Sequence, residues 1–170
     1  GCEACPAGEV KVPDTNGARD AVCTPATEAC GTAQYAKNGR CSPCDYGKVQ
    51  NGDGTGCEAC PAGEVKVPDT NGAKDAVCTP ATDACGTAQY AKNGRCSPCD
   101  YGRIRNDAGD GCVVCGPGTV KTPDTNGARD ATCELAASRC SANQIAMNGR
   151  CSSCASGRTP NADRTACVQA

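Results

Sequence analysis

Cysteine is the residue type here whose number and spacing could support chemistry. The chain has 170 residues, of which 19 are cysteines, and it has no histidine. Six Cys-x-x-Cys pairs occur, a pattern used by redox dithiols, by zinc sites with four thiolate ligands and by structural disulfides. A redox pair sits at a helix N-terminus in a βαβ setting, and nothing in this sequence resembles that setting.

Zinc is the stronger alternative, because the Cys-x-x-Cys pair at 41–44 is followed after twelve residues by the pair at 57–60, and the same spacing recurs at 96–99 and 112–115. In an oxidising compartment, however, closely spaced thiols pair with one another. We therefore predict structural disulfides, with no cofactor required and zinc as the alternative. The predicted disulfide cysteines are Cys2, Cys5, Cys23, Cys30, Cys41, Cys44, Cys57, Cys60, Cys78, Cys85, Cys96, Cys99, Cys112, Cys115, Cys133, Cys140, Cys151, Cys154 and Cys167.

The cysteines belong to a repeat, since adding 55 to each of the first six positions gives the next six, and adding 55 again gives a third set. We predict cysteine-rich repeats at 2–56, 57–111 and 112–166, with the start of a truncated fourth at 167–170. The second repeat differs from the first at eight positions, whereas the third keeps the cysteines and drifts elsewhere, as at Ile145 and Ser156. Such units touch only their neighbours, which predicts an elongated rod.

Composition sets the fold class. Phe and Trp are absent, Tyr occurs four times and Met once, so each repeat lacks the side chains that normally build a core. Three disulfides at about 2–4 kcal/mol each are large enough to offset that deficit. We predict small disulfide-rich repeats of the EGF, furin or TNF-receptor kind, with short β-hairpins and turns and little helix.

Local patterns indicate where these elements lie. Residues 9–12 alternate as a half-buried strand does, with Glu9 and Lys11 facing one way and the two valines the other. Asn16-Gly17 suits a two-residue hairpin turn, with 21–23 as the returning strand. Residues 24–34 hold one helical turn, with Thr24 as its cap. A further turn at 37–40 and a strand opened by residues 45–47 complete the repeat.

The segment Asp-Thr-Asn-Gly-Ala-Arg/Lys-Asp is the candidate metal site. It resembles the oxygen-rich part of calcium loops, although no bidentate Glu follows it and a cation lies inside it. The alternative is a turn in which Asp and Asn bond their own backbone. The calcium candidates are Asp14, Asn16, Asp20, Asp69, Asn71, Asp75, Asp124, Asn126 and Asp130.

Two disulfide registers fit the spacing, because six cysteines already allow 15 pairings. In the parallel register, consecutive Cys-x-x-Cys pairs join one another, as in Cys41–Cys57 and Cys44–Cys60, with Cys78 joining Cys85. In the sequential register, neighbours pair in turn from Cys5–Cys23 to Cys154–Cys167, and only Cys2 is left over. An odd cysteine count leaves at least one thiol without an intramolecular partner. It belongs either to a pair cut from a longer chain or, alternatively, to a bond joining molecules through the terminal cysteines.

Several function classes are disfavoured. The absence of histidine removes nucleophile–histidine pairs, and no pocket-forming core surrounds the carboxylates, so we do not expect an enzyme. The net charge is −2 without basic runs, which argues against nucleic acid as a partner. No apolar stretch approaches a membrane span, so this fragment is not expected to contact a membrane. We expect an extracellular piece of a longer exported protein.

Two runs resemble a known family: 41–60, with Cys-Ser-Pro-Cys-Asp-Tyr-Gly and Asn-Gly-Asp-Gly-Thr-Gly-Cys, and 151–167. They are similar to the Cys-x-x-Cys-rich ectodomains of the variant-specific surface proteins of Giardia. Ciliate immobilisation antigens and the furin-like or ephrin-receptor-like repeats of animal receptors resemble the chain less. The resemblance favours the parallel disulfide register, whereas economy of pairing favours the sequential one.

The resemblance implies an ectodomain that coats the cell, resists proteases and presents variable epitopes. The expected partners are host antibodies or neighbouring surface molecules, and the location is the cell surface, with the anchor outside this fragment. The alternative function is a structural or adhesive repeat module that binds a partner or assembles into a fibre.

Overall fold

The computed structural model describes residues 3–170. These residues form two compact units. Unit 1 runs to Pro80 and also includes Asn93–Arg95, and unit 2 comprises Ala81–Lys92 and Cys96–Ala170. Each unit is described by itself below.

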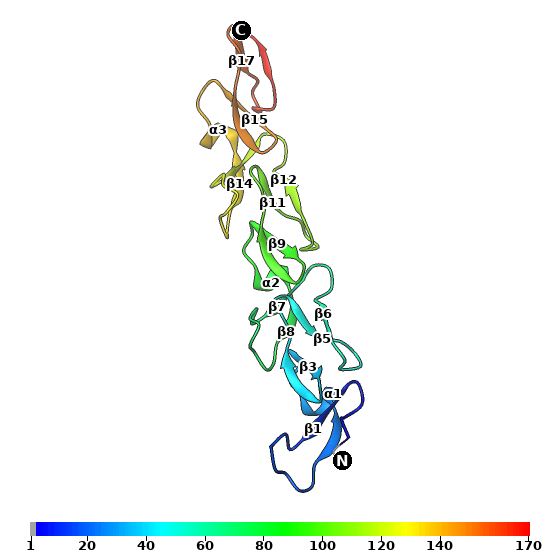
Figure 1. Cartoon of the computed structure of the whole chain (residues 1–170). Helices are drawn as coiled ribbons and strands as arrows, with labels where there is room; N and C mark the ends of the chain where they lie inside the picture. Colours follow the sequence, from blue (N-terminus) through cyan, green and yellow to red (C-terminus); the bar gives the residue numbers. More distant parts are fainter. Residues whose placement is uncertain (1–2) are drawn as a thin grey trace. The chain divides into compact units, whose positions relative to one another are not determined.

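Unit 1 consists of antiparallel hairpins and one short helix. The strands pair consecutively in two-stranded sheets. They are β1 (Glu9–Val12) with β2 (Val22–Pro25), β3 (Gln34–Lys37) with β4 (Arg40–Pro43), β5 (Lys48–Gln50) with β6 (Cys57–Ala59), and β7 (Glu64–Val67) with β8 (Val77–Pro80); helix α1 is Ala26–Ala29. The hairpins follow one another in chain order within the unit (Figure 1).

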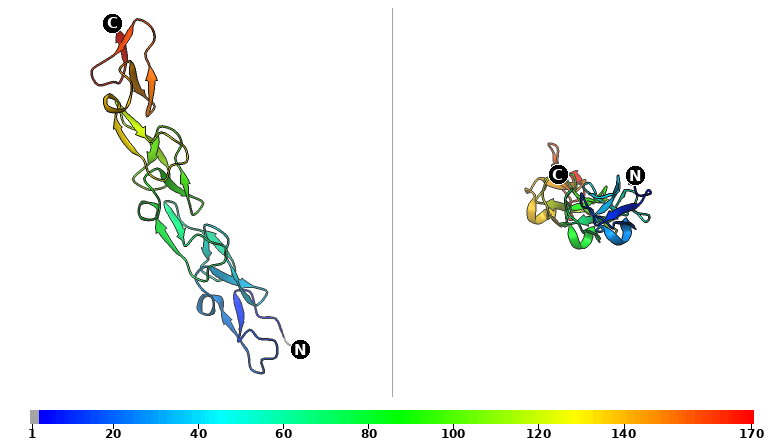
Figure 2. Two further views of the ribbon diagram at one scale, coloured as in Figure 1. Left: turned by 90° about the vertical axis from the view of Figure 1, so that its left-hand side faces the viewer. Right: turned by 60° about the horizontal axis from the view of Figure 1, so that its bottom comes forward.

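Unit 2 repeats the pattern. Its elements are α2 (Ala81–Ala84), β9 (Gln89–Lys92) paired with β10 (Arg95–Pro98), β11 (Arg103–Arg105) with β12 (Cys112–Val114), β13 (Thr119–Thr122) with β14 (Thr132–Leu135), α3 (Ala136–Arg139), β15 (Gln144–Met147) with β16 (Arg150–Ser153), and β17 (Arg158–Pro160) with β18 (Cys167–Gln169). Figure 2 shows that the hairpins of a unit do not share one central sheet. Tandem disulfide-rich repeats of short hairpins with little helix are the predicted fold class, which is confirmed.

Nine disulfides hold the hairpins, and all follow the sequential register. They are Cys5–Cys23, Cys30–Cys41, Cys44–Cys57, Cys60–Cys78, Cys85–Cys96, Cys99–Cys112, Cys115–Cys133, Cys140–Cys151 and Cys154–Cys167. The Cα atoms of each pair lie 5.5–5.8 Å apart, the usual distance for a disulfide. The parallel register is therefore wrong for this structure, and the leftover Cys2 lies outside the described residues. The sequential pairing closes loops between residues 11, 13 and 18 apart.

The buried core is made of small side chains and half-cystines. Val10, Val65 and Val120 are 2–3% exposed, and the first alanine of each short helix is fully buried. Cys44 and Cys99 are 1% exposed. Because these side chains bury little apolar area, each hairpin depends on its disulfide and on backbone hydrogen bonds to hold its shape.

The hairpin turns correct one local prediction. The two-residue turn is at Asn38-Gly39, where both residues have positive φ (52° and 76°), as a type I′ turn requires. Asn16-Gly17 instead lies inside a longer loop, because Val12 pairs with Val22 and leaves residues 13–21 between the strands. The predicted hairpin is present, but its connection is not a two-residue turn.

The strand and helix predictions also need correction. In β1 the inward residue is Val10, whereas Val12 is 44% exposed. In the equivalent strands β7 and β13 a lysine is buried instead of facing solvent. The helical turn is present as α1, but Thr24 belongs to β2 and Pro25 occupies the cap position without a side-chain hydrogen bond.

Candidate functional site at the joints between repeats

The cysteines of the Cys-x-x-Cys motifs act as cross-links. In the described part of the chain, each one bonds a cysteine outside its own motif, as Cys41 does with Cys30 and Cys44 with Cys57. These sulfurs are disulfide-bonded, so they are neither dithiols nor thiolate zinc ligands. Cys167 bonds Cys154 and therefore does not provide a free thiol for joining molecules.

The most elaborate polar arrangement lies where one repeat meets the next. We call the contact of residues 31–47 with residues 66–76 joint 1, and the equivalent contact of 86–102 with 121–131 joint 2. Joint 1 lies within unit 1 and joint 2 within unit 2. Because joint 2 contains the residues equivalent to those of joint 1 in the next repeat, the two joints can be compared residue by residue.

A threonine lies at the centre of each joint. In joint 1 the Thr32 hydroxyl donates to the Ala76 carbonyl (2.8 Å) and accepts from the Ala76 amide (2.9 Å). The Thr32 amide donates to Asp75 Oδ1 (3.0 Å), and the Ala33 amide donates to the Lys74 carbonyl (3.0 Å). Four hydrogen bonds thus hold the loop of one repeat against the edge of its predecessor.

Joint 2 repeats these bonds. The Thr87 hydroxyl donates to the Ala131 carbonyl (2.8 Å) and accepts from its amide (3.0 Å). The Thr87 amide donates to Asp130 Oδ1 (3.0 Å), and the Ala88 amide donates to the Arg129 carbonyl (3.0 Å). Ala76 and Ala131 are each 5% exposed, so this contact is largely closed to water.

A carboxylate forms the second part of the joint. Asp69 accepts from the Gly47 amide of the preceding repeat (2.7 Å) and from Arg95 Nε. The Arg95 guanidinium lies 4.5 Å from the ring centroid of Tyr46, a cation–π distance. This aspartate therefore ties the Tyr-Gly corner of one repeat to the next hairpin.

Joint 2 contains the same carboxylate arrangement. Asp124 accepts from the Gly102 amide (2.8 Å) and from Arg150 Nε, and Arg150 lies over the ring of Tyr101. The arginine is thus shared between an ion pair and an aromatic face in both joints.

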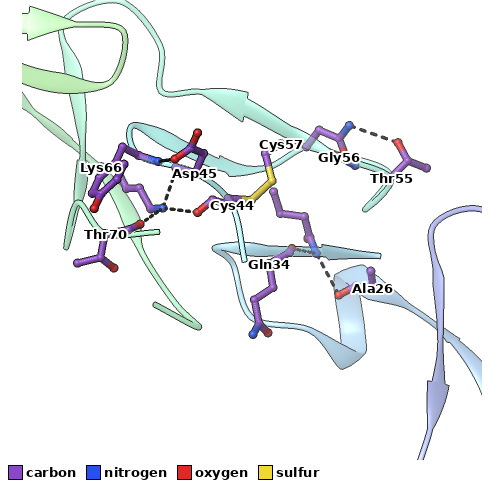
Figure 3. Close-up of a disulfide and its surroundings, with 12 residues drawn as sticks. Ala26, Gln34, Cys44, Asp45, Thr55, Gly56, Cys57, Lys66 and Thr70 are labelled. Atoms are coloured by element: carbon purple, nitrogen blue, oxygen red, sulfur yellow. Dashed lines mark hydrogen bonds between the residues drawn. A yellow bond between two sulfur atoms is a disulfide. The ribbon is translucent and has the colours of Figure 1, made fainter. Parts of the chain in front are cut away.

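A buried lysine forms the third part. Lys66 is 2% exposed, and its ammonium donates to the carbonyls of Cys44 (3.3 Å), Asp45 (3.1 Å) and Thr70 (2.6 Å). Figure 3 shows this ammonium beside the Cys44–Cys57 disulfide. All three of its N–H groups are satisfied, as a buried ammonium requires. Two of the acceptors belong to the preceding repeat, so this side chain also crosses the joint.

Lys121 reproduces that arrangement with the carbonyls of Cys99, Asp100 and Thr125. Burial lowers the pKa of both lysines, and the neighbouring aspartates raise it by a smaller amount. The ammonium thus pays a desolvation penalty that its three carbonyl partners offset.

The calcium candidates are distributed over these joints. Asp69, Asp75, Asp124 and Asp130 accept hydrogen bonds from N–H groups of the preceding repeat or of Arg95 and Arg150. Asp14 accepts from Arg40 Nε (2.6 Å), and Asp20 is exposed. The amides Asn16, Asn71 and Asn126 are exposed in the loops. Within residues 3–170 no three or more His, Cys, Asp or Glu side chains are grouped to hold a metal ion.

Sequence reasoning offered the loop as a candidate calcium site or as a turn, and it missed the threonine and the lysine. Their partners lie 21–44 residues away along the chain, beyond any local pattern. One signal was present in the sequence: the third repeat departs from the others at residues 141–143, the positions that correspond to the joint threonine and its neighbours.

Comparison with known proteins does not identify a family for this chain. No protein-family model matches the chain, and no curated protein matches it. In the part of the chain that the structure describes, no helix has the length and apolar content of a membrane span. The nine disulfides themselves indicate an extracellular or secreted protein.

Proposed function

We propose that this chain is part of the ectodomain of a cell-surface coat protein that resists proteolysis and presents epitopes to antibodies. The observation that carries the proposal is the closure of successive hairpins by disulfides between residues no more than 18 apart, from Cys5 to Cys167. Proteases cut a chain in locally opened states. Short cross-linked loops restrict those states, which supports a protective role.

The joints support the same role. Lys74 and Arg129 are surface cations in loops, and such residues are ordinary trypsin targets. Their carbonyls nevertheless accept from the Ala33 and Ala88 amides of the preceding repeats. A peptide bond held in this way must leave the joint before a protease can bind it. We therefore expect the loops of repeats 2 and 3 to resist proteases as the strands do.

Limited proteolysis tests the protective part of the proposal. The oxidised chain is digested with trypsin, and each sample is reduced after quenching so that nicks inside disulfide loops become visible on a gel. A reduced and alkylated chain is the control. We expect the oxidised chain to survive at least about a hundredfold longer, because its opening is restricted. Equal cleavage rates would remove the proposed function.

Antibody binding tests the location and the epitopes. Antibodies raised against the oxidised chain are applied to live, unpermeabilised cells that produce the full-length protein. Surface staining that is lost after mild protein reduction supports folded epitopes on a coat. Staining that appears only after permeabilisation would contradict the cell-surface location while leaving the disulfide fold intact.

The second candidate function is an adhesive or assembling repeat module. It is favoured by one observation: in the part of the chain that the structure describes, one face of the first repeat, lined by residues such as Lys11 and Ala21, has no other repeat packed against it. A partner bound at that face, rather than protease resistance, would then be the property that selection maintains.

A further inference from the structure

Each joint brings together two different faces of the repeat. The forward face contains a Gly-Thr-Ala segment, residues 31–33 in repeat 1 and 86–88 in repeat 2, together with the carbonyls and the glycine of the following Cys-Asp-Tyr-Gly segment. The rear face contains a strand lysine and parts of the loop that begins at the following proline. The lysine is Lys11, Lys66 or Lys121, and the loop contributes its first aspartate (Asp14, Asp69 or Asp124) and its last three residues. In both joints a forward face meets a rear face, so the joint has a direction.

The rear face of repeat 1 has the side chains of a joint, but within the described residues no forward face packs against it. Among residues 3–170, Lys11 donates only to the Thr15 carbonyl, whereas its equivalents each have three acceptors. Ala21 is exposed, whereas Ala76 and Ala131 are buried. A hollow of about 450 Å³ lies here, and Lys11, Asp14, Arg19 and Ala21 are among the residues that line it. The preceding repeat occupies the corresponding place in joints 1 and 2.

The forward face of repeat 3 is different at the decisive positions. Ser141 stands where the other repeats have Gly31 and Gly86. A Cβ atom at those glycines would lie 2.0 Å from the Lys74 carbonyl oxygen and 1.9 Å from that of Arg129. These distances are far below van der Waals contact, so a residue with a side chain at this position cannot accept the loop of a following repeat in the same way.

The next two positions reinforce this difference. Ala142 replaces the joint threonine and lacks the hydroxyl that makes two of its hydrogen bonds. Asn143 replaces an alanine that is fully buried at positions 33 and 88, and it is exposed. Its side-chain amide donates to the Cys154 carbonyl (3.3 Å). That carbonyl corresponds to those of Cys44 and Cys99, which accept from the joint lysines, so Asn143 occupies the lysine's acceptor.

Two further residues agree with this pattern. Ser156 replaces the tyrosines that lie beneath Arg95 and Arg150. Ala170 stands where Cys60 and Cys115 begin the disulfide of the next hairpin. The contacts that a rear face makes with its predecessor thus meet altered residues in repeat 3, except at the backbone of Gly157 and at the Cys154 carbonyl, which accepts from Asn143.

We propose that the Gly-Thr-Ala segment determines whether a repeat accepts a successor. The rear face of repeat 1 binds the forward face of another repeat of this type, while repeat 3 carries a terminating face that does not bind a rear face of this type. The joint therefore extends the array in one direction only. Copies of this chain do not add to one another head to tail through it.

The test uses the full chain extended by one repeat at either end, so that the covalent link keeps the two faces at high local concentration. One chain carries a copy of residues 2–56 directly before Cys2. A second carries the same copy directly after Ala166, which continues the cysteine period. A third is the second chain with the substitutions Ser141→Gly, Ala142→Thr and Asn143→Ala. Amide hydrogen exchange is measured by NMR, with the Thr87 and Ala88 amides of joint 2 as the internal reference.

In the first chain we expect the threonine and alanine amides of the added Gly-Thr-Ala segment to be protected within about tenfold of the reference. In the second we expect the amides of residues 142 and 143 to exchange at least a hundredfold faster than the reference. In the third their protection returns to within about tenfold. Protection at 142 and 143 in the second chain, or its absence in the first or third, overturns the proposal. Hairpin amides of the added copy report whether that copy is folded in each chain, and its fold in the first chain shows that the copy folds when it is attached.

Discussion

Replacing Lys66 with methionine should open joint 1 while leaving the hairpins intact. Methionine keeps most of the length and apolar character of the lysine stem, so the packing of β7 is retained. The substitution removes the ammonium, and the carbonyls of Cys44, Asp45 and Thr70 lose their shared donor. Two of these carbonyls belong to repeat 1 and one to repeat 2, so the loss falls on the joint.

The magnitude follows from the contacts. Hydrogen bonds with a charged donor contribute about 1.5–3 kcal/mol each. Counting only the two shorter ones, at 3.1 and 2.6 Å, gives about 3–6 kcal/mol before the penalty for burying the ammonium is subtracted. That penalty is real, because burial lowers the pKa of Lys66. We therefore expect a net loss of about 2–4 kcal/mol in the free energy of opening the joint.

Native-state hydrogen exchange measures this loss where it occurs. The reporters are the Thr32, Ala33 and Gly47 amides, all of which donate across joint 1. Each 1.4 kcal/mol corresponds to a tenfold change, so protection should fall about 30- to 700-fold. The β3–β4 amides, which belong to a disulfide-closed hairpin, should change by less than threefold.

Lys11→Met is the matched control. It removes the same side chain from the same place in a hairpin, but Lys11 is half-buried and, as far as residues 3–170 are concerned, donates to a single carbonyl. We expect the protection of the β1–β2 amides to fall by less than about fivefold, because one exposed hydrogen bond contributes little. The reasoning fails if Lys66→Met leaves the three reporters unchanged. It also fails if Lys11→Met weakens β1–β2 as much as Lys66→Met weakens joint 1.

Three other outcomes are expected. Trypsin should nick the oxidised chain after Arg19 at least about tenfold faster than after Lys74 or Arg129, as mass spectrometry of reduced samples will show; all three bonds precede an aspartate, but only the last two carbonyls are held by a joint amide. Gly86→Ala should destabilise joint 2 by about 1–3 kcal/mol or more, because its Cβ meets the Arg129 carbonyl at 1.9 Å. Gly127→Ala, with open space around it, should change the exchange of the same amides by less than about 0.5 kcal/mol. The side-chain Cε resonances of Lys66 and Lys121 should titrate below the ordinary lysine pKa of about 10.4, because the pKa of each is lowered by burial. The folded chain releases these protons before the unfolded chain does. The destabilising penalty of burying the charge is therefore fully present below the lowered pKa, and it declines as the pH rises from there toward the ordinary value.

The cross-linked hairpins were predictable because their signals are local or strictly periodic. Cysteines at a repeat of 55, with few large apolar residues, predicted a disulfide-rich fold, and the Asn38-Gly39 turn lies where a turn was expected. The spacing could not choose between two disulfide registers, since both bring together cysteines that are close in sequence. The structure selects the sequential one.

The loop of residues 13–21 shows why the remainder was not predictable. Asn16-Gly17 and Asn38-Gly39 are the same dipeptide, yet only the second forms a two-residue turn. The equivalent loop in repeat 2 reaches back to Thr32, which lies 44 residues before Ala76. In repeats 2 and 3 the long loop makes the contacts between repeats, and no local propensity reports that requirement. In repeats 2 and 3, the candidate calcium carboxylates accept hydrogen bonds from backbone amides of the preceding repeat.

Lys11, Lys66 and Lys121 show how one repeat completes the environment of a side chain in the next. Identical residues in equivalent strands are half-buried in the first repeat and 2% exposed in the other two. The difference cannot arise within a repeat; it arises because repeats 2 and 3 each have a predecessor that supplies two carbonyls. A side chain whose environment is completed by the neighbouring repeat makes the stability of one repeat depend on the presence of another. The buried core consists of valines, alanines and half-cystines, which bury little apolar area. The joints, more than this core, therefore determine which repeats pack against one another.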